Sequence, residues 1–286
     1  MSNRSSVSHT SVIKVNSTGT HHMDDWLAAE EPLEIRLSFG ALSQRKQQSI
    51  SVTMRTPGND FELATGFLFT EGIIKGAEDI QSIKHCNGLQ ENVVRVELKE
   101  DVPVDIGKLE RNFYTTSSCG VCGKSSIEAV RTVCRLSNTT NDTLQFSSGI
   151  IHTLPVVLRS RQSIFDSTGG LHACALFDTS GNLVLTREDV GRHNALDKLI
   201  GAALAQSLFP LDKHLLLLSG RASFELIQKA WMAGIKIVAA VGAPSSLAAQ
   251  MAEEVGMTLI GFLRNEVFNI YSGEQRIIIP AYENSY

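Results

Sequence analysis

The stretch HACALFDTSGNLVLTREDVGRHNALDK, residues 172–198, contains the pattern that decides the fold class of this chain. Two apolar runs flank the turn residues Thr-Ser-Gly-Asn, an arrangement typical of a β-hairpin. A helical pattern follows in GRHNALDKLIGAALAQ, residues 191–206. A hairpin that leads directly into a helix predicts a domain in which helices pack on a sheet, and therefore an α/β fold.

The same alternation continues towards the C-terminus. Strands are expected in KHLLLLS, IKIVAAVG and MTLIGFL, and helices in ASFELIQKAWMA and SSLAAQMAEEV. Strands that are apolar along their whole length are typical of a parallel sheet covered by helices on both faces. Gly234 and Gly256 stand where the C-terminal caps of the two helices belong. The sequence therefore predicts a three-layer α/β/α domain over residues 149–275.

The N-terminal part of the chain predicts a smaller α+β domain over residues 27–110. The runs LEIRLSFG, QQSISVTMRT and NVVRVEL alternate polar with apolar residues, as half-buried strands do. Between them, Phe61, Leu63 and Phe67 have helical spacing, and Gly72 can end that helix. We expect the polar residues 1–26 to be a flexible leader, and residues 276–286 to be a C-terminal tail.

A connector over residues 111–148 carries the most distinctive motif, TTSSCGVCGKSS. Its richness in Ser, Thr and Asn is typical of exposed loops. Cys119 and Cys122 lie just before a helical pattern, and Lys124 follows two residues later. A helix N-terminus and a nearby Lys both lower the pKa of a thiol and make it a better nucleophile. The motif therefore favours a reactive thiol.

Half of a zinc site is the alternative explanation for this CxxC motif. A structural zinc ion needs four ligands, and the remaining cysteines, Cys86, Cys134 and Cys174, are scattered. Cys134 and Cys174 also fall within apolar patterns that indicate buried packing. We therefore predict no bound metal. A thioredoxin-like oxidoreductase is disfavoured, because in that class the CxxC follows the first strand of a βαβ unit.

A second candidate site lies where the predicted strands end. Ligands of open α/β sheets bind at the carboxyl ends of the strands, and helix N-termini favour anions. The polar residues expected there are Arg187, Arg192, His193, Ser219, Gly220, Arg221 and Arg264. Arginines repeated at several strand ends of an acidic protein indicate a pocket for a phosphate or pyrophosphate. His172, beside a strand, is expected to be a satisfied edge or core histidine.

Composition limits the possible functions. The formal net charge is −4 with no long basic run, which argues against a broad nucleic-acid surface. No apolar run reaches the roughly 18 residues of a membrane span, and the N-terminus lacks the apolar centre of a secretory signal. Five cysteines, an odd number, do not make a disulfide framework, so a reducing cytoplasm is the expected location.

The order of the predicted elements resembles the cytidine-deaminase-like fold. Those enzymes gather zinc with an H-x-E at one helix start and a P-C-x-x-C at the next. The corresponding places here are GRHNA and SGRAS, so the zinc thiolates and the glutamate are missing. Deamination is therefore disfavoured, and glycine and arginine stand where the metal would be.

Several motifs occur in an order that resembles one known family. They are RTPGNDFELATGFLFTEGII, SSCGVCGKSS, TGGLHACALF, REDVGRHNALDK, SGRASFELIQKA and GFLRNEVFNIYSG. Together they resemble the formate dehydrogenase accessory sulfurtransferases of the FdhD family, over about residues 30–275. That family has a cytidine-deaminase-like fold without zinc, which agrees with the order of elements.

The resemblance implies a function that the spacing alone does not establish. It implies a sulfurtransferase that takes sulfur from a cysteine desulfurase as a persulfide and passes it to the molybdenum of a bis(molybdopterin guanine dinucleotide) cofactor. Formate dehydrogenase needs that sulfur. Cys119 would carry the persulfide, and Cys122 would assist. The family's cofactor-binding segment corresponds to Phe262, Leu263, Arg264, Asn265, Glu266 and Val267.

Other properties expected from the resemblance are the ligand class and the assembly. GDP is expected to bind in place of the guanine end of the cofactor, and a homodimer is the expected assembly. The alternative is a molybdenum-cofactor chaperone that binds the guanine nucleotide moiety but performs no sulfur chemistry.

Overall fold

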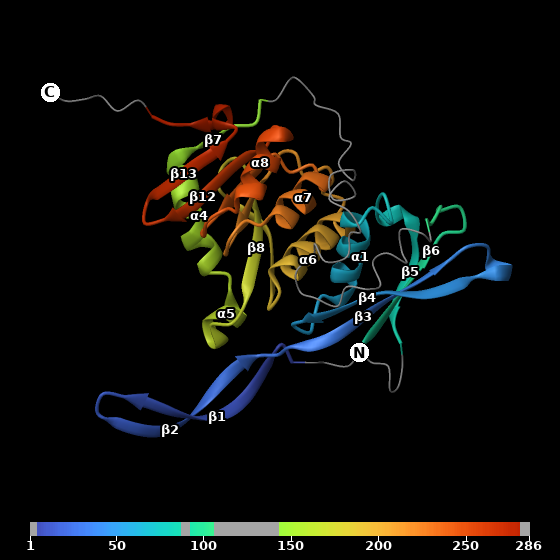
Figure 1. Ribbon diagram of the computed structural model, residues 1–286, viewed down its shortest axis with the longest axis horizontal. Helices are drawn as coiled ribbons and strands as arrows, with labels where there is room; N and C mark the ends of the chain where they lie inside the picture. The colour runs from blue at the N-terminus through green and yellow to red at the C-terminus, as the bar shows by residue number, and fades with distance from the viewer. Residues whose placement is uncertain (1–4, 87–91, 106–142, 281–286) are drawn as a thin grey trace.

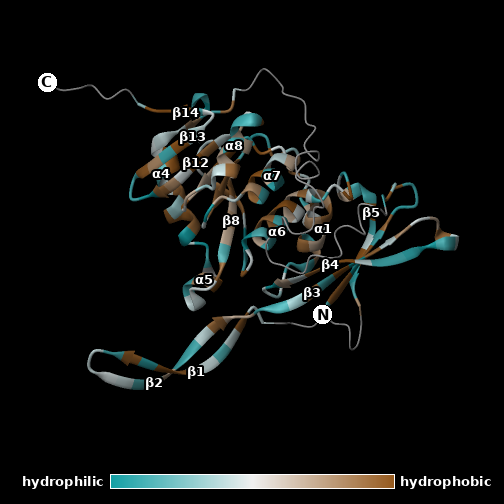
Figure 2. Cartoon of the chain, viewed as in Figure 1, coloured by the Kyte–Doolittle hydropathy of each residue, from teal (hydrophilic) through white to brown (hydrophobic). Residues whose placement is uncertain are grey.

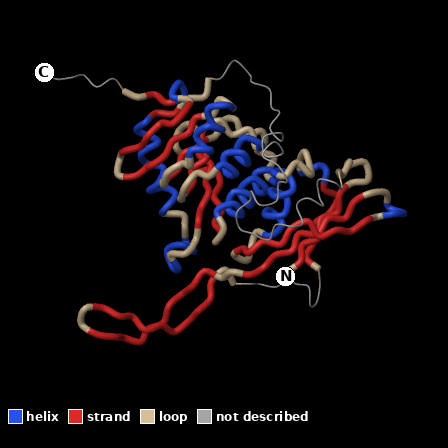
Figure 3. The backbone as a smooth tube through the Cα atoms, viewed as in Figure 1, coloured by secondary structure: helices blue, strands red, loops and turns tan. Residues whose placement is uncertain are grey.

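The computed structural model of the chain describes residues 5–86, 92–105 and 143–280 (Figure 1). Two main sheets and the helices that pack on them make up the body, which confirms the predicted α/β class (Figure 3). A two-stranded hairpin and a short pair of strands complete the described sheets. Cys119, Cys122 and the rest of the expected connector as far as residue 142 lie outside the described residues.

The larger sheet has six strands in the order β13-β12-β11-β10-β8-β9. Its strands are β8 (His172–Phe177), β9 (Leu183–Asp189), β10 (Leu215–Leu218), β11 (Ile237–Ala240), β12 (Thr258–Arg264) and β13 (Val267–Ser272). Strands β10, β11 and β12 are parallel to one another, whereas β8 is antiparallel to β10, and β13 to β12. The predicted hairpin and the three predicted parallel strands are therefore confirmed.

Helices cover both faces of this sheet. Helices α6 (Arg192–Ala205), α7 (Phe224–Met232) and α8 (Ser246–Glu254) pack on one face, against side chains such as Leu216 and Leu218. Helix α4 (Ser148–Arg159) packs on the other face, against Leu215 and Leu217. Because alternate residues of a strand point to opposite faces, an apolar strand buries both sets of side chains.

The smaller sheet has the order β4-β3-β6-β5. Its strands are β3 (Glu31–Phe39), β4 (Lys46–Arg55), β5 (Ile80–His85) and β6 (Val93–Leu98), and helix α1 (Asp60–Thr70) packs against it. Leu33, Leu63 and Leu196 belong to one buried cluster that also reaches the large sheet. The sequence predicted two separate domains, but this shared core joins their elements.

The polar N-terminal segment differs from the expectation of a flexible leader. Strands β1 (Val7–Asn16) and β2 (Gly19–Ala28) form an antiparallel hairpin that projects from the body (Figure 1). Asn16 Oδ1 accepts hydrogen bonds from the backbone N–H and the hydroxyl of Thr18, which shapes the turn. Ile13 and Val15 flank Lys14, a short alternation that the polarity of the segment concealed.

Short elements connect these units. Helix α5 (Ser163–Thr168) follows α4, and β7 (Phe146–Ser147) pairs in parallel with β14 (Ile277–Ile278). The expected C-terminal tail therefore begins with a short strand. Single 3₁₀ turns span Leu42–Gln44, Ala77–Asp79 and Glu274–Arg276. Within the described ranges, no helix combines the length and the apolar character that a membrane crossing requires.

Candidate functional site

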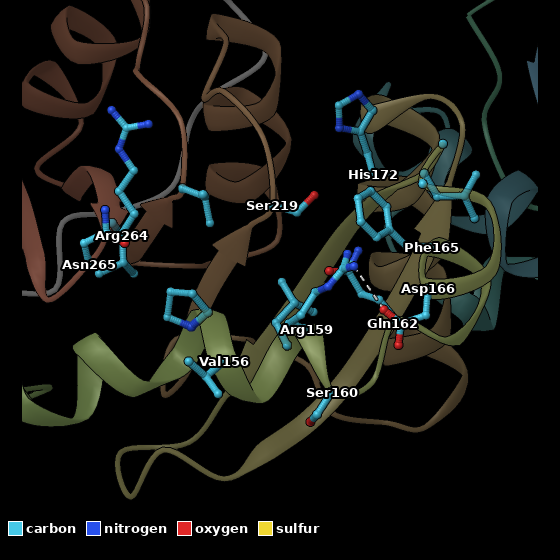
Figure 4. Close-up of a pocket in the computed structure, with 17 residues that line it drawn as sticks. Val156, Arg159, Ser160, Gln162, Phe165, Asp166, His172, Ser219, Arg264 and Asn265 are labelled. Atoms are coloured by element: carbon cyan, nitrogen blue, oxygen red, sulfur yellow. Dashed lines mark ion pairs between the residues drawn. The ribbon is translucent and has the colours of Figure 1, made fainter. Parts of the chain in front are cut away.

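A pocket of about 910 Å³ opens at the carboxyl ends of the parallel strands (Figure 4). Ser219 follows β10, Val241 follows β11, and Arg264 ends β12, so three neighbouring strands each deliver a lining residue. This is the edge at which ligands of open α/β sheets bind. The volume is within the range of small-molecule sites, roughly 300–1,000 Å³.

Helices α4 and α5 form the opposite wall of the pocket. The guanidinium of Arg159 lies 3.1 Å from the carboxylate of Asp166 and 4.1 Å from the ring centroid of Phe165 (Figure 4). Gln162, which also lines the pocket, is almost fully buried. This wall therefore combines an aromatic ring with charged and carboxamide groups, a composition suited to a polar ligand that has a flat ring.

The segment Phe262–Val267 forms the end of β12 and the turn into β13. Leu263, Arg264 and Asn265 line the pocket, and Phe262 and Val267 border an adjoining hollow of about 370 Å³. Phe262, Asn265 and Glu266 have positive φ angles of 55°, 52° and 58°. Left-handed backbone at three non-glycine residues is costly, and such strain concentrates at functional sites. The middle of the predicted segment therefore lines the pocket, and its two ends border the hollow beside it.

Arg264 is exposed at the rim, and its guanidinium lies 5.8 Å from the ring centroid of Phe262. Among the described residues, this side chain has no carboxylate partner within ion-pair distance. An Arg fork at the edge of a pocket can hold a phosphate through two parallel hydrogen bonds. Of the arginines predicted at the strand ends, Arg264 is the one that lines the pocket.

His172 lines the pocket, although its sequence context indicated an ordinary edge histidine. It begins β8, which runs antiparallel to β10, so its strand starts where the parallel strands end. Burial lowers the pKa of His172, and the positive charges of Arg192 and His193 lower it further. The signal that could have revealed it is its position. A polar residue at the start of a strand that runs antiparallel to the parallel strands lies at their carboxyl ends.

Gly220 makes room for this histidine. A Cβ atom added at Gly220 would lie 3.1 Å from His172 Nδ1, closer than most carbon contacts in proteins. The neighbouring Ser219 hydroxyl accepts a hydrogen bond of 2.8 Å from the backbone N–H of Ala173. The Ser219–Gly220 pair therefore joins the start of β8 to the end of β10.

Arg192 and His193 open helix α6 but do not line the pocket. His193 Nε2 lies 3.4 Å from the hydroxyl of Ser223 and 3.8 Å from a carboxylate oxygen of Glu225, both at the start of α7. The hydrogen bond with His193 is the main cause that lowers the pKa of Glu225 to about 2. Arg192 Nε is buried and has no hydrogen-bond partner within the described part of the chain.

Two further arginines of the prediction do not line the pocket. The guanidinium of Arg187 forms a two-pronged ion pair with Glu62 of helix α1, with one hydrogen bond of 2.7 Å. Arg221 is exposed and packs its stem against Gly242, where an added Cβ would lie 3.0 Å from Arg221 Cγ. Arg187 therefore belongs to the contact between the two sheets rather than to an anion pocket.

Two cysteines, Cys86 and Cys174, lie in the described part of the chain. Cys174 is buried on β8, as its apolar context predicted, and burial raises the pKa of its thiol far above the usual range. Cys86 is half-buried and forms no disulfide. Within residues 5–86, 92–105 and 143–280, no three His, Cys, Asp or Glu side chains are grouped to hold a metal ion.

Comparison with known proteins gives the family. Residues 28–278 match the FdhD/NarQ family model. The chain is 49% identical over 276 residues to the sulfur carrier protein FdhD of Streptomyces avermitilis, covering 94% of this chain and 95% of that protein. It is 54% identical over 257 residues to that of Mycolicibacterium paratuberculosis, covering 88% and 91%. It is 39% identical over 266 residues to that of Saccharolobus solfataricus, covering 93% and 96%.

A solved structure supports the fold. The crystal structure of a candidate formate dehydrogenase accessory protein from Desulfotalea psychrophila superposes with a TM-score of 0.74, covering 96% of this chain and 100% of that one. Its sequence identity is 24%, so it supports the fold alone. The family model and the relatives share nearly the whole length of this chain. The chain belongs to the FdhD/NarQ family.

Proposed function

We propose that this chain is a sulfurtransferase of formate dehydrogenase maturation, which carries sulfur as a persulfide on Cys119 and delivers it to a molybdenum cofactor. The observation that carries the proposal is the similarity to proteins named sulfur carrier protein FdhD, at 39% to 54% identity over most of both chains. The related crystal structure comes from a protein described as a candidate formate dehydrogenase accessory protein.

The sulfur step is thiol exchange on Cys119. Its thiolate attacks the terminal sulfur of a persulfide on a cysteine desulfurase, the S–S bond of the donor breaks, and the donor leaves as a thiolate. The sulfur is then held on Cys119 as a persulfide. When it passes on as a neutral sulfur atom, the S–S bond breaks, Cys119 leaves as a thiolate, and the acceptor would supply the two electrons that reduce the sulfur to sulfide. Cys122, three positions later, assists the relay. Such chemistry requires free thiols, as in a reducing cytoplasm.

The acceptor is the molybdenum of a bis(molybdopterin guanine dinucleotide) cofactor, which serves here as cargo. Its guanosine and pyrophosphate groups match the chemistry of the pocket: Arg264 at the rim for phosphate, and Phe165 with polar neighbours on the α4–α5 wall for a ring. GDP should bind in the same pocket. Formate dehydrogenase is the enzyme that finally receives the sulfurated cofactor.

In this proposal, the other predicted site residues lie behind the pocket and hold its lining residues in position. Gly220 provides the space for His172, and burial, together with Arg192 and His193, lowers the pKa of its imidazole. Arg221 stays a predicted contact of the cofactor at the start of α7. The fold in this proposal is cytidine-deaminase-like without zinc, because Arg192 and Arg221 occupy the helix starts where those enzymes hold the metal.

Persulfide mapping tests the sulfur step. The wild-type protein is incubated with a cysteine desulfurase and free cysteine, its thiols are alkylated, and its peptides are analysed by mass spectrometry. We expect one additional sulfur on Cys119 in the wild type and in the control Cys86→Ala. We expect none in Cys119→Ala, whose fold is checked by far-UV circular dichroism. A wild type that binds GDP but never acquires the sulfur is instead a cofactor chaperone.

Calorimetry with GDP tests the pocket. Arg264→Ala removes one charge-assisted contact to phosphate, worth about 1.5–3 kcal/mol, so GDP should bind roughly ten- to a hundredfold more weakly. Arg161→Ala is the matched control, because Arg161 is exposed beside α4 and does not line the pocket. Measurements at one fixed salt concentration separate the contact from general screening. Equal affinities for the wild type and Arg264→Ala would move the phosphate site elsewhere.

A further inference from the structure

Helix α5 (Ser163–Thr168) borders two cavities. Phe165 and Asp166 line the pocket of about 910 Å³ (Figure 4). Ile164 lines a second cavity of about 160 Å³, called the small cavity below. Open space rather than packed side chains therefore surrounds part of this helix, and close packing does not by itself hold it in one position.

A helix of this length also does not hold itself. It has six residues, and isolated helices shorter than about 12–15 residues are marginal in water. Its N-cap residue, Gln162, makes no side-chain capping bond to the first turn. At the other end, Gly169 has a φ of 66°, and its N–H donates to the carbonyl of Phe165 at 2.7 Å. The position of α5 therefore depends on contacts with other elements.

Glu188 of strand β9 holds the N-terminal end of α5. Its Oε1 accepts a hydrogen bond of 3.3 Å from the backbone N–H of Phe165. A carboxylate at the start of a helix satisfies an N–H group that has no partner within the helix, and the helix dipole favours its negative charge. Glu188 pairs with Ala173 of β8 in the six-stranded sheet, so this contact ties α5 to the sheet.

No cation accounts for the position of Glu188. The carboxylate is half-buried at the edge of the small cavity, and it forms no ion pair within the described ranges of the chain. Two cationic side chains line the same cavity, but Arg187 pairs with Glu62, and Lys198 pairs with Asp189. The backbone of α5 is therefore the partner that this carboxylate has.

Placing a carboxylate there has an energetic cost. Burial raises the pKa of Glu188, and the nearby carboxylate of Asp166 also raises it, whereas the backbone N–H groups of Phe165 and Ile164 lower it. The start of α5 thus offsets part of the cost of burying the charge. Glu188 and α5 stabilise each other.

Two further contacts attach α5 less firmly. Asp166 pairs with Arg159 of α4, but their side chains are 55% and 53% exposed, and exposed ion pairs contribute little. The helix also faces strand β2 of the N-terminal hairpin (Figures 1 and 2). There a Cβ atom added at Gly170 would lie 3.5 Å from Ala28 Cβ, an apolar contact without direction.

We propose that Glu188 is the positioning residue of the α5 wall: its carboxylate fixes the start of α5 and thereby the place where the ring of Phe165 meets the ligand. The proposal rests on the proposed function, in which the pocket binds the guanosine and pyrophosphate groups of the cofactor. Glu188 is not among the residues that line that pocket, so it acts on the ligand through Phe165.

Hydrogen exchange of two Glu188 variants tests the contact without any ligand. Glu188→Leu keeps the size of the side chain but removes both acceptor oxygens, whereas Glu188→Gln keeps one. The amide of Phe165 should exchange about tenfold faster in Glu188→Leu, because a hydrogen bond to a charged acceptor is lost, and near the wild-type rate in Glu188→Gln. Glu253→Leu, which removes an exposed carboxylate from α8, should leave this amide unchanged. Equal rates in the wild type and Glu188→Leu would overturn the proposal.

Calorimetry with two ligands separates positioning from a general loss of structure. GDP should bind Glu188→Leu about tenfold more weakly, because its ring depends on the α5 wall, and Glu188→Gln should restore the affinity to within about twofold of the wild type. Inorganic pyrophosphate should bind Glu188→Leu as it binds the wild type, because it reaches Arg264 and has no ring. Its binding also shows that the variant folds.

Two results with these ligands would contradict the positioning role. They are an unchanged GDP affinity in a Glu188→Leu variant whose Phe165 amide exchanges faster, and equal losses for GDP and pyrophosphate. A wild type that binds neither ligand would instead overturn the proposed function of the pocket, and the exchange rates would still decide whether Glu188 holds α5.

Discussion

The imidazole of His172 belongs both to the lining of the pocket and to the packing behind it. It lines the pocket, it touches the space left by Gly220, and it lies within the electrostatic reach of Arg192 and His193. Burial, Arg192 and His193 each lower the pKa of His172, against an opposing effect of the Asp189 carboxylate, so the neutral imidazole is favoured. A neutral ring offers one donor and one acceptor to a ligand, whereas a protonated ring would offer only donors.

This environment predicts the titration of His172. The midpoint, measured by NMR of the imidazole, should lie below the ordinary value of 6.5, and Arg192→Ala should raise it because a positive neighbour is lost. Arg161→Ala removes a charge that is not among those acting on His172, so it should leave the midpoint unchanged. A wild-type midpoint at or above 6.5 would contradict the described surroundings.

The same shift has a consequence for stability. A base whose pKa is lowered by folding binds its proton more readily in the unfolded chain, so this contribution to stability is present above pH 6.5. It is lost as the pH falls from 6.5 towards the lower folded value. The pH dependence of the free energy of unfolding should therefore flatten in this window when His172 is replaced by Gln.

The turn between β12 and β13 contains strained backbone. Arg264 pairs with Val267, so the two-residue loop is Asn265–Glu266, and both residues have positive φ. Such a loop is typical of a type I′ turn, in which Asn is common at the first position and Gly at the second. Glu266 is therefore the strained member of a turn at the mouth of the pocket.

Relief of this strain should stabilise the protein. Glu266→Gly should raise the free energy of unfolding by up to about 1 kcal/mol, because relief of the left-handed strain exceeds the added entropy of the unfolded chain. Urea denaturation measures the change. Glu253→Gly, in the ordinary helical backbone of α8, should instead lower stability by up to about 1 kcal/mol. Equal losses in both variants would show that Glu266 is not strained.

At the scale of the whole molecule, the crossing of α1 and α6 joins the two sheets. Gly66 of α1 and Gly201 of α6 face each other's helix, and a Cβ at Gly66 would overlap the backbone carbonyl of Asp197. Near the same crossing, Lys229 Nζ donates to Asp197 at 2.9 Å and to the Thr70 hydroxyl at 2.8 Å. The helices approach so closely only because neither has a side chain at the crossing point.

The crossing predicts one cooperative unfolding transition for both sheets. Gly66→Ala should lower the free energy of unfolding by about 3 kcal/mol, because rigid backbone has to move. Gly149→Ala is the control, since the nearest atom to its Cβ would be the Ser147 hydroxyl at 3.6 Å, and it should be neutral or slightly stabilising. Calorimetry with two separate transitions would instead support two independent domains.

Local patterns were sufficient for the elements of the large sheet. Apolar runs such as Leu215–Leu218 predict buried strands, and Gly234 and Gly256 adopt the positive φ that ends α7 and α8 as expected. These signals survive because period and glycine position are properties of the chain itself. The same reasoning failed for residues 7–28, because their polar composition is typical of a flexible segment and their strands have no sustained alternation of polar and apolar residues.

By itself, the sequence determined the α/β class, the succession of strands and helices in the large sheet, and an arginine at the end of its last parallel strand. The sulfur chemistry of the CxxC motif stays a prediction. Only the tertiary structure decided which strand-end residues meet. It placed His172 in the pocket and Arg187 on Glu62, although both lie near strand ends in the sequence. The physical reason is that periodicity specifies which face of an element is buried, whereas side-chain partners depend on packing between segments far apart in the chain.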